Sequence, residues 1–192
     1  VIGAAVSADG DYNNIDPGDI SVTNIDDDDS GISVSAISGN TTEDGGEATF
    51  TMVLDSQPSA DVTIGVSSSD ESEGTVSPSL LTFTDANWNV AQTVTVTGVD
   101  DFIDDGLISY TIVIEPASST DLDYNNRDLP NKYIYNIDDD ELGVFPSAKS
   151  GNTTEAGGEA TFTMVLGSQP SADVTISLSS NNESEGTVSP SL

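Results

Sequence analysis

Residues 48–54 read Ala-Thr-Phe-Thr-Met-Val-Leu, and every second side chain in this stretch is apolar. An apolar period of two is typical of a β-strand that buries one face, because successive side chains of a strand point to opposite sides. About seven short strands per unit, with no amphipathic helix, predict an all-β fold, an antiparallel, immunoglobulin-like β-sandwich. The other runs with this alternation lie between Gly-, Pro-, Asn-, Asp- and Ser-rich turns, at residues 32–37, 62–66, 81–83, 94–96, 110–114 and 134–137.

An internal repeat predicts the domain organisation. Residues 38–80 recur with few changes as residues 150–192, and the same separation of 112 residues aligns all of 1–80 with 113–192 without a gap. About 110 residues suit one two-sheet core. We therefore expect tandem repeats, and we expect this sequence to be part of a longer array of them. The predicted units are the C-terminal part of one repeat at 1–29, a complete repeat at 30–140, and the N-terminal part of a further repeat at 141–192.

The composition excludes several classes of function. The chain has 34 Asp and Glu against 3 Lys and Arg, no His, no Cys and a formal net charge of −31. Without His or Cys there is no Ser-His-Asp or Cys-His nucleophile, no zinc site with nitrogen and sulfur ligands, and no disulfide. Nucleic acid and anionic lipid need a basic surface, so neither is expected as a partner. No stretch predicts direct membrane insertion, and cations are the natural partners.

Acid gathers in three clusters of the complete repeat, each at a loop or a strand end. The clusters are residues 100–105, residues 138–140, and Glu43 with Asp44 before the strand of Phe50. Consecutive like charges repel unless something neutralises them. If the loops converge at one end of the sandwich, a hard cation such as Ca²⁺, which takes about six to eight oxygen ligands, would bind them. The alternative is that each run is a solvated loop that aids solubility.

The strand pattern together with these clusters resembles the Calx-beta domain, a seven-stranded sandwich of sodium-calcium exchanger regulatory regions and of bacterial surface and adhesin-type proteins. The matching features are Glu43 followed by Gly46 and a strand, the strand at 94–96 that runs into the acidic loop, and the closing run Asn-Ile-Asp-Asp-Asp at 136–140. Leu107 departs from the pattern, because family members often place another acid there.

The resemblance implies a site for several Ca²⁺ ions at the C-terminal pole of the complete domain, beside the next repeat. The ligands it implies there are Glu43, Asp70, Asp100, Asp101, Asp104, Asp105, Asp138, Asp139 and Asp140. The repeat assigns four further acids to the corresponding sites of the two partial units, and these are Asp26, Asp27, Asp28 and Glu155.

Three weaker signals have structural alternatives. Asn40, Asn152 and Asn182 open Asn-X-Ser/Thr triplets, which are possible glycosylation sites but also arise by chance in a chain rich in Ser and Thr. Residues 121–125 have the opening spacing of an EF-hand loop, yet the sixth position is Asn126 rather than Gly. They predict an Asx-rich turn or an accessory cation site. Trp88, the only Trp, is expected to cover one end of the core.

These observations favour a calcium-binding structural repeat of an extracellular adhesin stalk or a secreted surface filament. Ca²⁺ would rigidify the junctions between neighbouring repeats, and the other partners would be further copies of the chain in a filament. The alternative is a calcium-dependent sensor or module that binds a ligand, either a surface glycan or a protein. An enzyme is not expected, because the acids cluster at strand ends without a marked aromatic platform for a glycoside substrate.

Overall fold

In residues 30–140, the predicted complete repeat, most strands lie where the apolar period of two predicted them, in a computed structural model that describes residues 1–190. No helix occurs in these residues, so none is long and apolar enough to cross a membrane. Nine strands fall in the complete repeat: β1 (Ile32–Val34), β2 (Thr41–Thr42), β3 (Glu47–Leu54), β4 (Val62–Ser68), β5 (Gly74–Ser77), β6 (Leu80–Phe83), β7 (Gln92–Gly98), β8 (Leu107–Ile114) and β9 (Lys132–Ile137).

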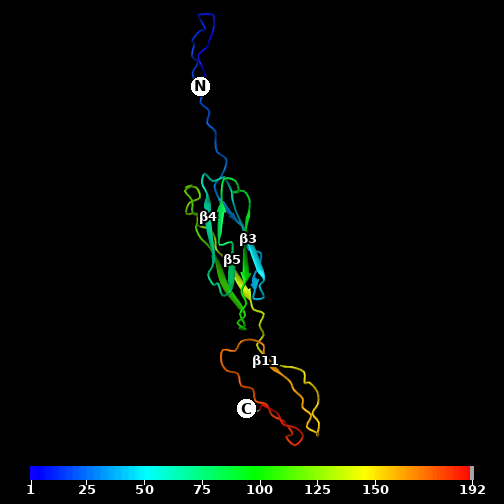
Figure 1. Cartoon of the computed structure of the whole chain (residues 1–192). Helices are drawn as coiled ribbons and strands as arrows, with labels where there is room; N and C mark the ends of the chain where they lie inside the picture. The colour runs from blue at the N-terminus through cyan, green and yellow to red at the C-terminus, as the bar shows by residue number, and fades with distance from the viewer. Residues whose placement is uncertain (191–192) are drawn as a thin grey trace.

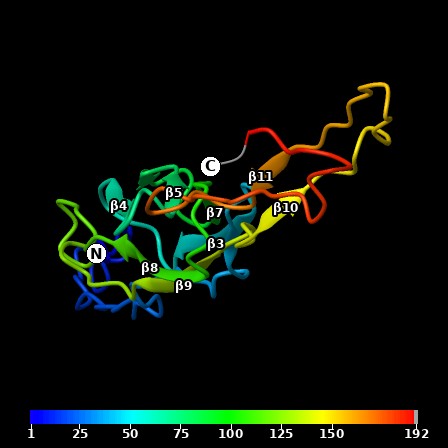
Figure 2. The ribbon, with the colours of Figure 1, turned by 90° about the horizontal axis from the view of Figure 1, so that it is seen from below.

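The strands form two sheets. The first has the order β1-β3-β7-β5, and the second has the order β2-β9-β8-β4-β6. Seen from below, β8 and β9 lie on the opposite side of the repeat from β5 and β7 (Figure 2). The number of strands exceeds the predicted seven partly because residues 32–42 form two strands, β1 in the first sheet and β2 in the second.

One strand pair departs from the expected antiparallel arrangement. β2 pairs with β9 in parallel, with Thr41 opposite Asn136 and Thr42 opposite Ile137, whereas the other strand pairs of the two sheets are antiparallel. The prediction of a purely antiparallel sandwich is therefore wrong at this pair. The reason is the crossing from the first sheet to the second after β1, which brings the chain into β2 in the same direction as β9.

Side chains from both sheets make one hydrophobic core. β3 alternates strictly between buried and less buried residues, so that Ala48, Phe50, Met52 and Leu54 all point inwards. The second sheet contributes Ile64, Tyr110, Ile112 and Ile134, among others. Burial of this apolar surface is the main stabilising term of the repeat. Trp88 is partly buried and packs against the core, in the turn that precedes β7.

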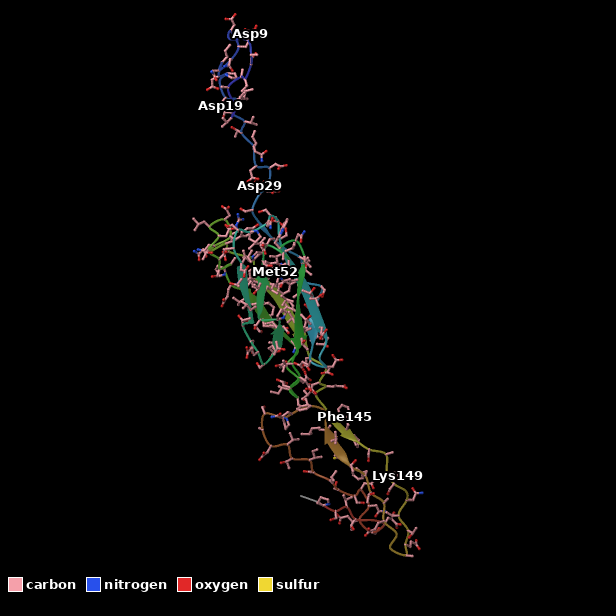
Figure 3. All side chains as sticks on the ribbon, turned by 45° about the horizontal axis from the view of Figure 1, so that its top comes forward. Asp9, Asp19, Asp29, Met52, Phe145 and Lys149 are labelled. Carbon is pink, nitrogen blue, oxygen red and sulfur yellow. The ribbon has the colours of Figure 1, made fainter. Side chains whose placement is uncertain are left out.

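The flanking segments leave the complete repeat at opposite ends (Figure 1). Residues 1–29 contain a turn at 8–14 and no strand, and Asp9, Asp19 and Asp29 are spread along this extended segment (Figure 3). The strands in residues 141–190 are the antiparallel pair β10 (Val144–Pro146) and β11 (Met164–Leu166), and Thr154 and Gly158 form an isolated bridge. Residues 191 and 192, the end of the third predicted unit, lie outside the described residues.

The same sequence has a different environment in the complete repeat and in the segment that follows it. Phe50 is 1% exposed, whereas the matching Phe162 is 44% exposed. Val62 and Val174 differ in the same way, at 0% and 49%. Burial at these positions therefore depends on the partner strands and not on the local sequence.

Candidate metal centre

The parallel pair β2–β9 brings two of the acidic clusters together. Both strands end at the same edge, so Glu43 and Asp138 follow the neighbouring residues Thr42 and Ile137. The backbone N–H of Glu43 continues the ladder by donating to the carbonyl oxygen of Ile137 at 3.0 Å. The third cluster, residues 100–105, crosses from β7 in the first sheet to β8 in the second.

We call the end of the repeat formed by Glu43, residues 100–105 and residues 138–140 the acidic pole. Two groups of carboxylates share Glu43 as their common member. One joins Glu43 to Asp100 and Asp139, and the other joins it to Asp138 and Asp140. Within each group, one oxygen of every residue lies within 4.8 Å of the others. One cation could therefore contact three carboxylates in either group.

Glu43 is buried, with 3% of its surface exposed, and its Oε2 has no hydrogen-bond partner among the described residues. Asp140 Oδ2 and Asn136 Oδ1 are buried and unpartnered in the same way. Buried polar atoms are normally hydrogen-bonded, so each exception needs an explanation. A bound cation would supply the missing partner of the two carboxylate oxygens.

The carboxylates at the pole perturb one another. The pKa of Glu43 is raised to about 7, first by burial and then by the charges of Asp138, Asp101 and Asp105, in that order. Burial and the neighbouring acids Asp101, Asp138 and Asp104 also raise the pKa of Asp105. Groups whose charges repel in a desolvated site favour either a proton or a metal ion.

Asp138 behaves differently because backbone amides hold its charge. Its Oδ2 accepts from the N–H of Gly106 at 2.7 Å and of Asp105 at 2.9 Å, and its Oδ1 accepts from Asp140 at 2.7 Å. These bonds, that of Gly106 first, lower the pKa of Asp138. They also tie the 100–105 loop to the end of β9, and they favour the ionised form of Asp138.

The three basic residues of the chain contact other parts of it. Arg127 donates to the carbonyl oxygen of Asp123 and to Ser30, both at 2.7 Å. Lys132 lies over the ring of Phe50, and Lys149 donates to Asn152. None of these contacts involves the acidic pole. An all-oxygen, strongly anionic donor set fits a hard divalent cation, and its irregular loops suit Ca²⁺ better than Mg²⁺.

The remaining predicted ligands of the acidic loop point in different directions. Asp101 accepts from the N–H of Ile103 at 2.7 Å, within the loop. Asp104 accepts from the N–H of Leu142 at 2.6 Å, which lies beyond the pole in the following segment. Gln169 of that segment donates its N–H to the carbonyl oxygen of Phe102 at 2.5 Å. The loop that carries the predicted ligands therefore also contacts residues 141–190.

Asp70 lies in neither group of carboxylates. It is exposed, and its Oδ1 accepts from the N–H of Ser72 at 3.1 Å and from the Ser72 hydroxyl at 2.5 Å. Asn182, at the matching position, accepts the same two bonds from Ser184. A side-chain amide oxygen accepts these two bonds as well as a carboxylate oxygen does. The hydrogen bonds of the turn therefore account for Asp70 without a metal ion.

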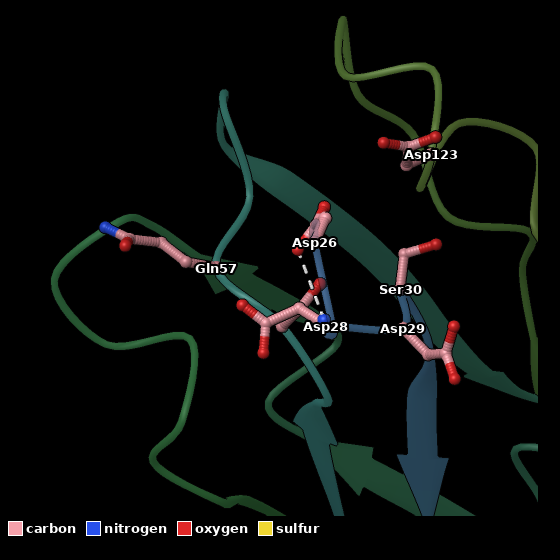
Figure 4. A pocket seen from close by; sticks show the side chains of 7 residues that line it. Asp26, Asp28, Asp29, Ser30, Gln57 and Asp123 are labelled. Carbon is pink, nitrogen blue, oxygen red and sulfur yellow. Dashed lines mark hydrogen bonds between the residues drawn. The ribbon is translucent and has the colours of Figure 1, made fainter. Parts of the chain in front are cut away.

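The ligands predicted for the partial units are separate from the acidic pole. Asp26 and Asp28 line a pocket at the opposite end of the repeat, together with Asp29, Ser30, Ser56, Gln57 and Asp123 (Figure 4). Asp27 and Glu155 are exposed. The glycosylation candidates Asn40, Asn152 and Asn182 are exposed as well.

The EF-hand-like loop is built by hydrogen bonds within the protein. Asp121 is 8% exposed, and its Oδ2 accepts from the N–H and the hydroxyl of Ser59 at 2.7 and 2.8 Å. Its Oδ1 accepts from the N–H of Asp123 at 3.0 Å, as in an Asx turn. The carboxylate is satisfied by these donors, which also lower its pKa.

Sequence reasoning missed two residues beneath the pole, Glu73 and Asn136. Glu73 is 8% exposed, and Asn136 is fully buried. One signal was available for Asn136, because it continues the inward-facing alternation of β9 after Ile134, and a polar residue at such a position needs partners. No comparable signal marked Glu73, since its burial follows from the pairing of β5 with β7.

Comparisons with known proteins do not assign a family. No family model matches the chain, and no curated protein matches it. Among solved structures, WR4, an MSP family member of C. elegans, has 14% identity and a TM-score of 0.35, over 52% of this chain and 90% of its own. SSP-19, an MSP-domain-like protein of Caenorhabditis elegans, has 12% identity and a TM-score of 0.35, over 54% and 98%.

Proposed function

We propose that the complete repeat binds several Ca²⁺ ions at the acidic pole, and that the bound ions stiffen the joint to the following unit. Glu43 is the observation that carries this proposal. It is a buried carboxylate with an unpartnered oxygen, and it belongs to both groups of acids. Burying an unpaired charge costs several kcal/mol in a real protein, so a cation at this position removes a large penalty.

The 100–105 loop connects the acidic pole to the joint with the following residues. Asp104 accepts from Leu142, and Phe102 accepts from Gln169, so the loop contacts both the linker and the next unit. An ion held by Asp100 and Asp139 would fix this loop relative to the end of β9. With the loop fixed, the linker loses freedom to bend. Without the ion, repulsion between the carboxylates would loosen both the 100–105 loop and the linker.

The function that fits this behaviour is that of a structural repeat of the Calx-beta type, in tandem, in an extracellular adhesin stalk or surface filament. The repeat of 112 residues supports the tandem arrangement. Extracellular modules bind Ca²⁺ with dissociation constants of about 10⁻⁴ to 10⁻³ M, which calcium-rich surroundings satisfy. The partners would be neighbouring repeats and, in a filament, other copies of the chain. The proposal involves no enzymatic step.

Thermal melting and small-angle X-ray scattering of the whole chain test this proposal together. With millimolar Ca²⁺ we expect a higher melting temperature than in EDTA, because the ligand binds only the folded state. We also expect a larger maximum dimension, because the joint straightens. Mg²⁺ at the same concentration is the control and should have a smaller effect. Melting and scattering curves that are the same in Ca²⁺ and EDTA would contradict the proposal.

A second candidate function is binding of a ligand such as a surface glycan. Tyr133 and Tyr135 point outwards from β9 and are 79% and 47% exposed. The matching residues of the preceding unit are Ser21 and Thr23, so that unit lacks the aromatic pair. Exposed Tyr rings combine an apolar face with a polar tip, which suits a sugar. Glycan-array binding that the Y133A/Y135A double variant loses would favour this candidate.

A further inference from the structure

Glu73 is a buried acid directly beneath the acidic pole. It is 8% exposed and immediately precedes β5, which pairs with β7. The carbonyl oxygen of Glu73 accepts from the N–H of Val99 at 3.1 Å, next to Asp100. The backbone therefore holds Glu73 beside the start of the acidic loop.

Asn136 provides the only side-chain donor to Glu73 among the described residues. Its Nδ2 donates to the carbonyl oxygen of Val99 at 3.0 Å and lies 3.5 Å from Oε2 of Glu73, at the limit of a hydrogen bond. One weak bond does not compensate a buried carboxylate. Asn136 thus orients Glu73 relative to the loop, and no other group of the described residues donates to the Glu73 carboxylate.

The surroundings of Glu73 are anionic. Burial raises its pKa, the bond from Asn136 opposes this effect, and Asp105, Asp70 and Asp101 raise the pKa further. Asp101 and Asp105 belong to the acidic loop, and the backbone bond between Val99 and Glu73 holds Glu73 next to the start of that loop. The buried, unpartnered Oε2 of Glu43 is an independent sign that the same pole accepts a ligand.

We propose that Glu73 is a cation ligand of the acidic pole, next to the start of the 100–105 loop, and that Asn136 is the residue that positions it. The inference rests on the proposed function and adds a buried ligand to it. Glu73 belongs to neither group of three carboxylates, so as a ligand it would add an anionic oxygen from outside them. Additional ligand charge is one of the properties that tune Ca²⁺ affinity.

Calorimetric titration of the full chain with Ca²⁺ alone tests the assignment. Glu73→Gln keeps the size and the acceptor oxygen but removes the charge, and Glu71→Gln is the matched control, because Glu71 is exposed in the same loop. We expect E73Q to weaken the tightest Ca²⁺ binding about tenfold or more, and E71Q to change it less than twofold. Wild-type affinity in E73Q, with clear binding by the wild type, overturns this inference alone. No binding by the wild type overturns the proposed function as well.

Melting in EDTA distinguishes a ligand from a residue that only supports the fold. If Glu73 is a ligand, E73Q should melt in EDTA at or above the wild-type temperature, because a buried charge among other acids is gone. Its melting temperature should then rise less than that of the wild type when Ca²⁺ is added. A structural role predicts a lower melting temperature in EDTA with an unchanged gain from Ca²⁺. A lower melting temperature in EDTA with an unchanged rise on adding Ca²⁺ overturns the assignment. The comparison stays valid for a less stable variant, because the rise is measured within each protein.

Discussion

At the scale of single residues, Glu43 is the feature that most needs a partner. Its carboxylate is buried beside Asp138, and it shares a site with Asp100, Asp139 and Asp140. Glu73 is a second buried acid, and its carboxylate accepts one hydrogen bond, from Asn136. The three basic residues of the chain are engaged elsewhere, so neither acid has a counter-ion from the protein. Their environment makes them sensitive to both protons and metal ions.

The first prediction concerns calcium affinity at Glu43. Glu43→Gln removes the charge that both groups of carboxylates share, so we expect at least a tenfold loss of Ca²⁺ affinity by calorimetry. Glu47→Gln is the control, because Glu47 is exposed at the start of β3. Equal affinities in the two variants would contradict the central place of Glu43.

The second prediction concerns pH in the absence of metal. The pKa of Glu43 is raised from 4.5 to about 7, so the folded state holds a proton that the unfolded state has released between these values. The stability that this proton provides is fully present below pH 4.5 and is lost as the pH rises through about 7.

In EDTA, E43Q should therefore melt above the wild type at pH 8, and the two should converge towards pH 4.5. Melting curves followed by circular dichroism at several pH values measure this difference. A difference between the two proteins that does not change with pH would contradict the raised pKa.

At the scale of elements, the approach of β2, β7 and β9 builds the pole. Gly98 ends β7, and a Cβ there would collide with the carbonyl oxygen of Thr42 and lie 2.7 Å from Oδ1 of Asn136. The backbone of Gly98 also donates to the carbonyl oxygen of Gly46 at 3.1 Å. The two sheets can close at this end only because position 98 has no side chain.

The third prediction follows from that closure. Gly98→Ala should destabilise the protein by about 1–3 kcal/mol, as overpacking of a tight site does, and should weaken Ca²⁺ binding because it separates β2 from β7. Gly39→Ala is the control, since no atom lies within 4 Å of the Cβ it would add. Chemical denaturation and calorimetry measure both effects. Equal stabilities for the two variants would contradict the packing argument.

The fourth prediction compares two positions with the same local sequence. Phe50→Ala should cost about 3–5 kcal/mol, because Phe50 is 1% exposed in the core of β3. Phe162→Ala should change the stability much less, because Phe162 is 44% exposed. Chemical denaturation of the two variants measures the difference. Similar losses would show that residues 141–190 contribute an equally closed core in solution.

At the scale of the whole molecule, a net charge of −31 on 192 residues opposes compaction. The charge is not spread evenly, because the acidic pole collects acids from three separate parts of the chain. Calcium bound at the pole would therefore remove repulsion where it is strongest. Salt would screen the remaining surface charge in a general way.

The fifth prediction separates these two effects. In EDTA, raising NaCl from about 0.01 to 0.1 M shortens the Debye length from about 30 to about 10 Å and should raise the melting temperature. With saturating Ca²⁺ the same change should have a clearly smaller effect. Melting by circular dichroism under the four conditions provides the measurement. A salt response that is the same with and without Ca²⁺ would contradict a concentrated site.

Local sequence patterns predicted seven of the nine strands in residues 30–140, without β2 and β5, and the positions of the acidic runs. The period of two at 48–54 predicted β3 and its buried face, because alternation along a strand is a local property of the backbone. The acidic runs at 100–105 and 138–140 lie at strand ends, as their Asp- and Gly-rich composition indicated.

Which of these acids lie close together, and which are buried, depends on contacts between strands that are distant in the chain. The parallel pairing of β2 with β9 places Glu43 beside Asp138, and no local pattern predicted that direction. The burial of Glu73 and of Phe50, but not of Phe162, likewise depends on strands far away in the chain. Burial and unsatisfied charge depend on non-local packing. For this reason the sequence alone did not identify Glu73 and Asn136 as residues of the candidate site.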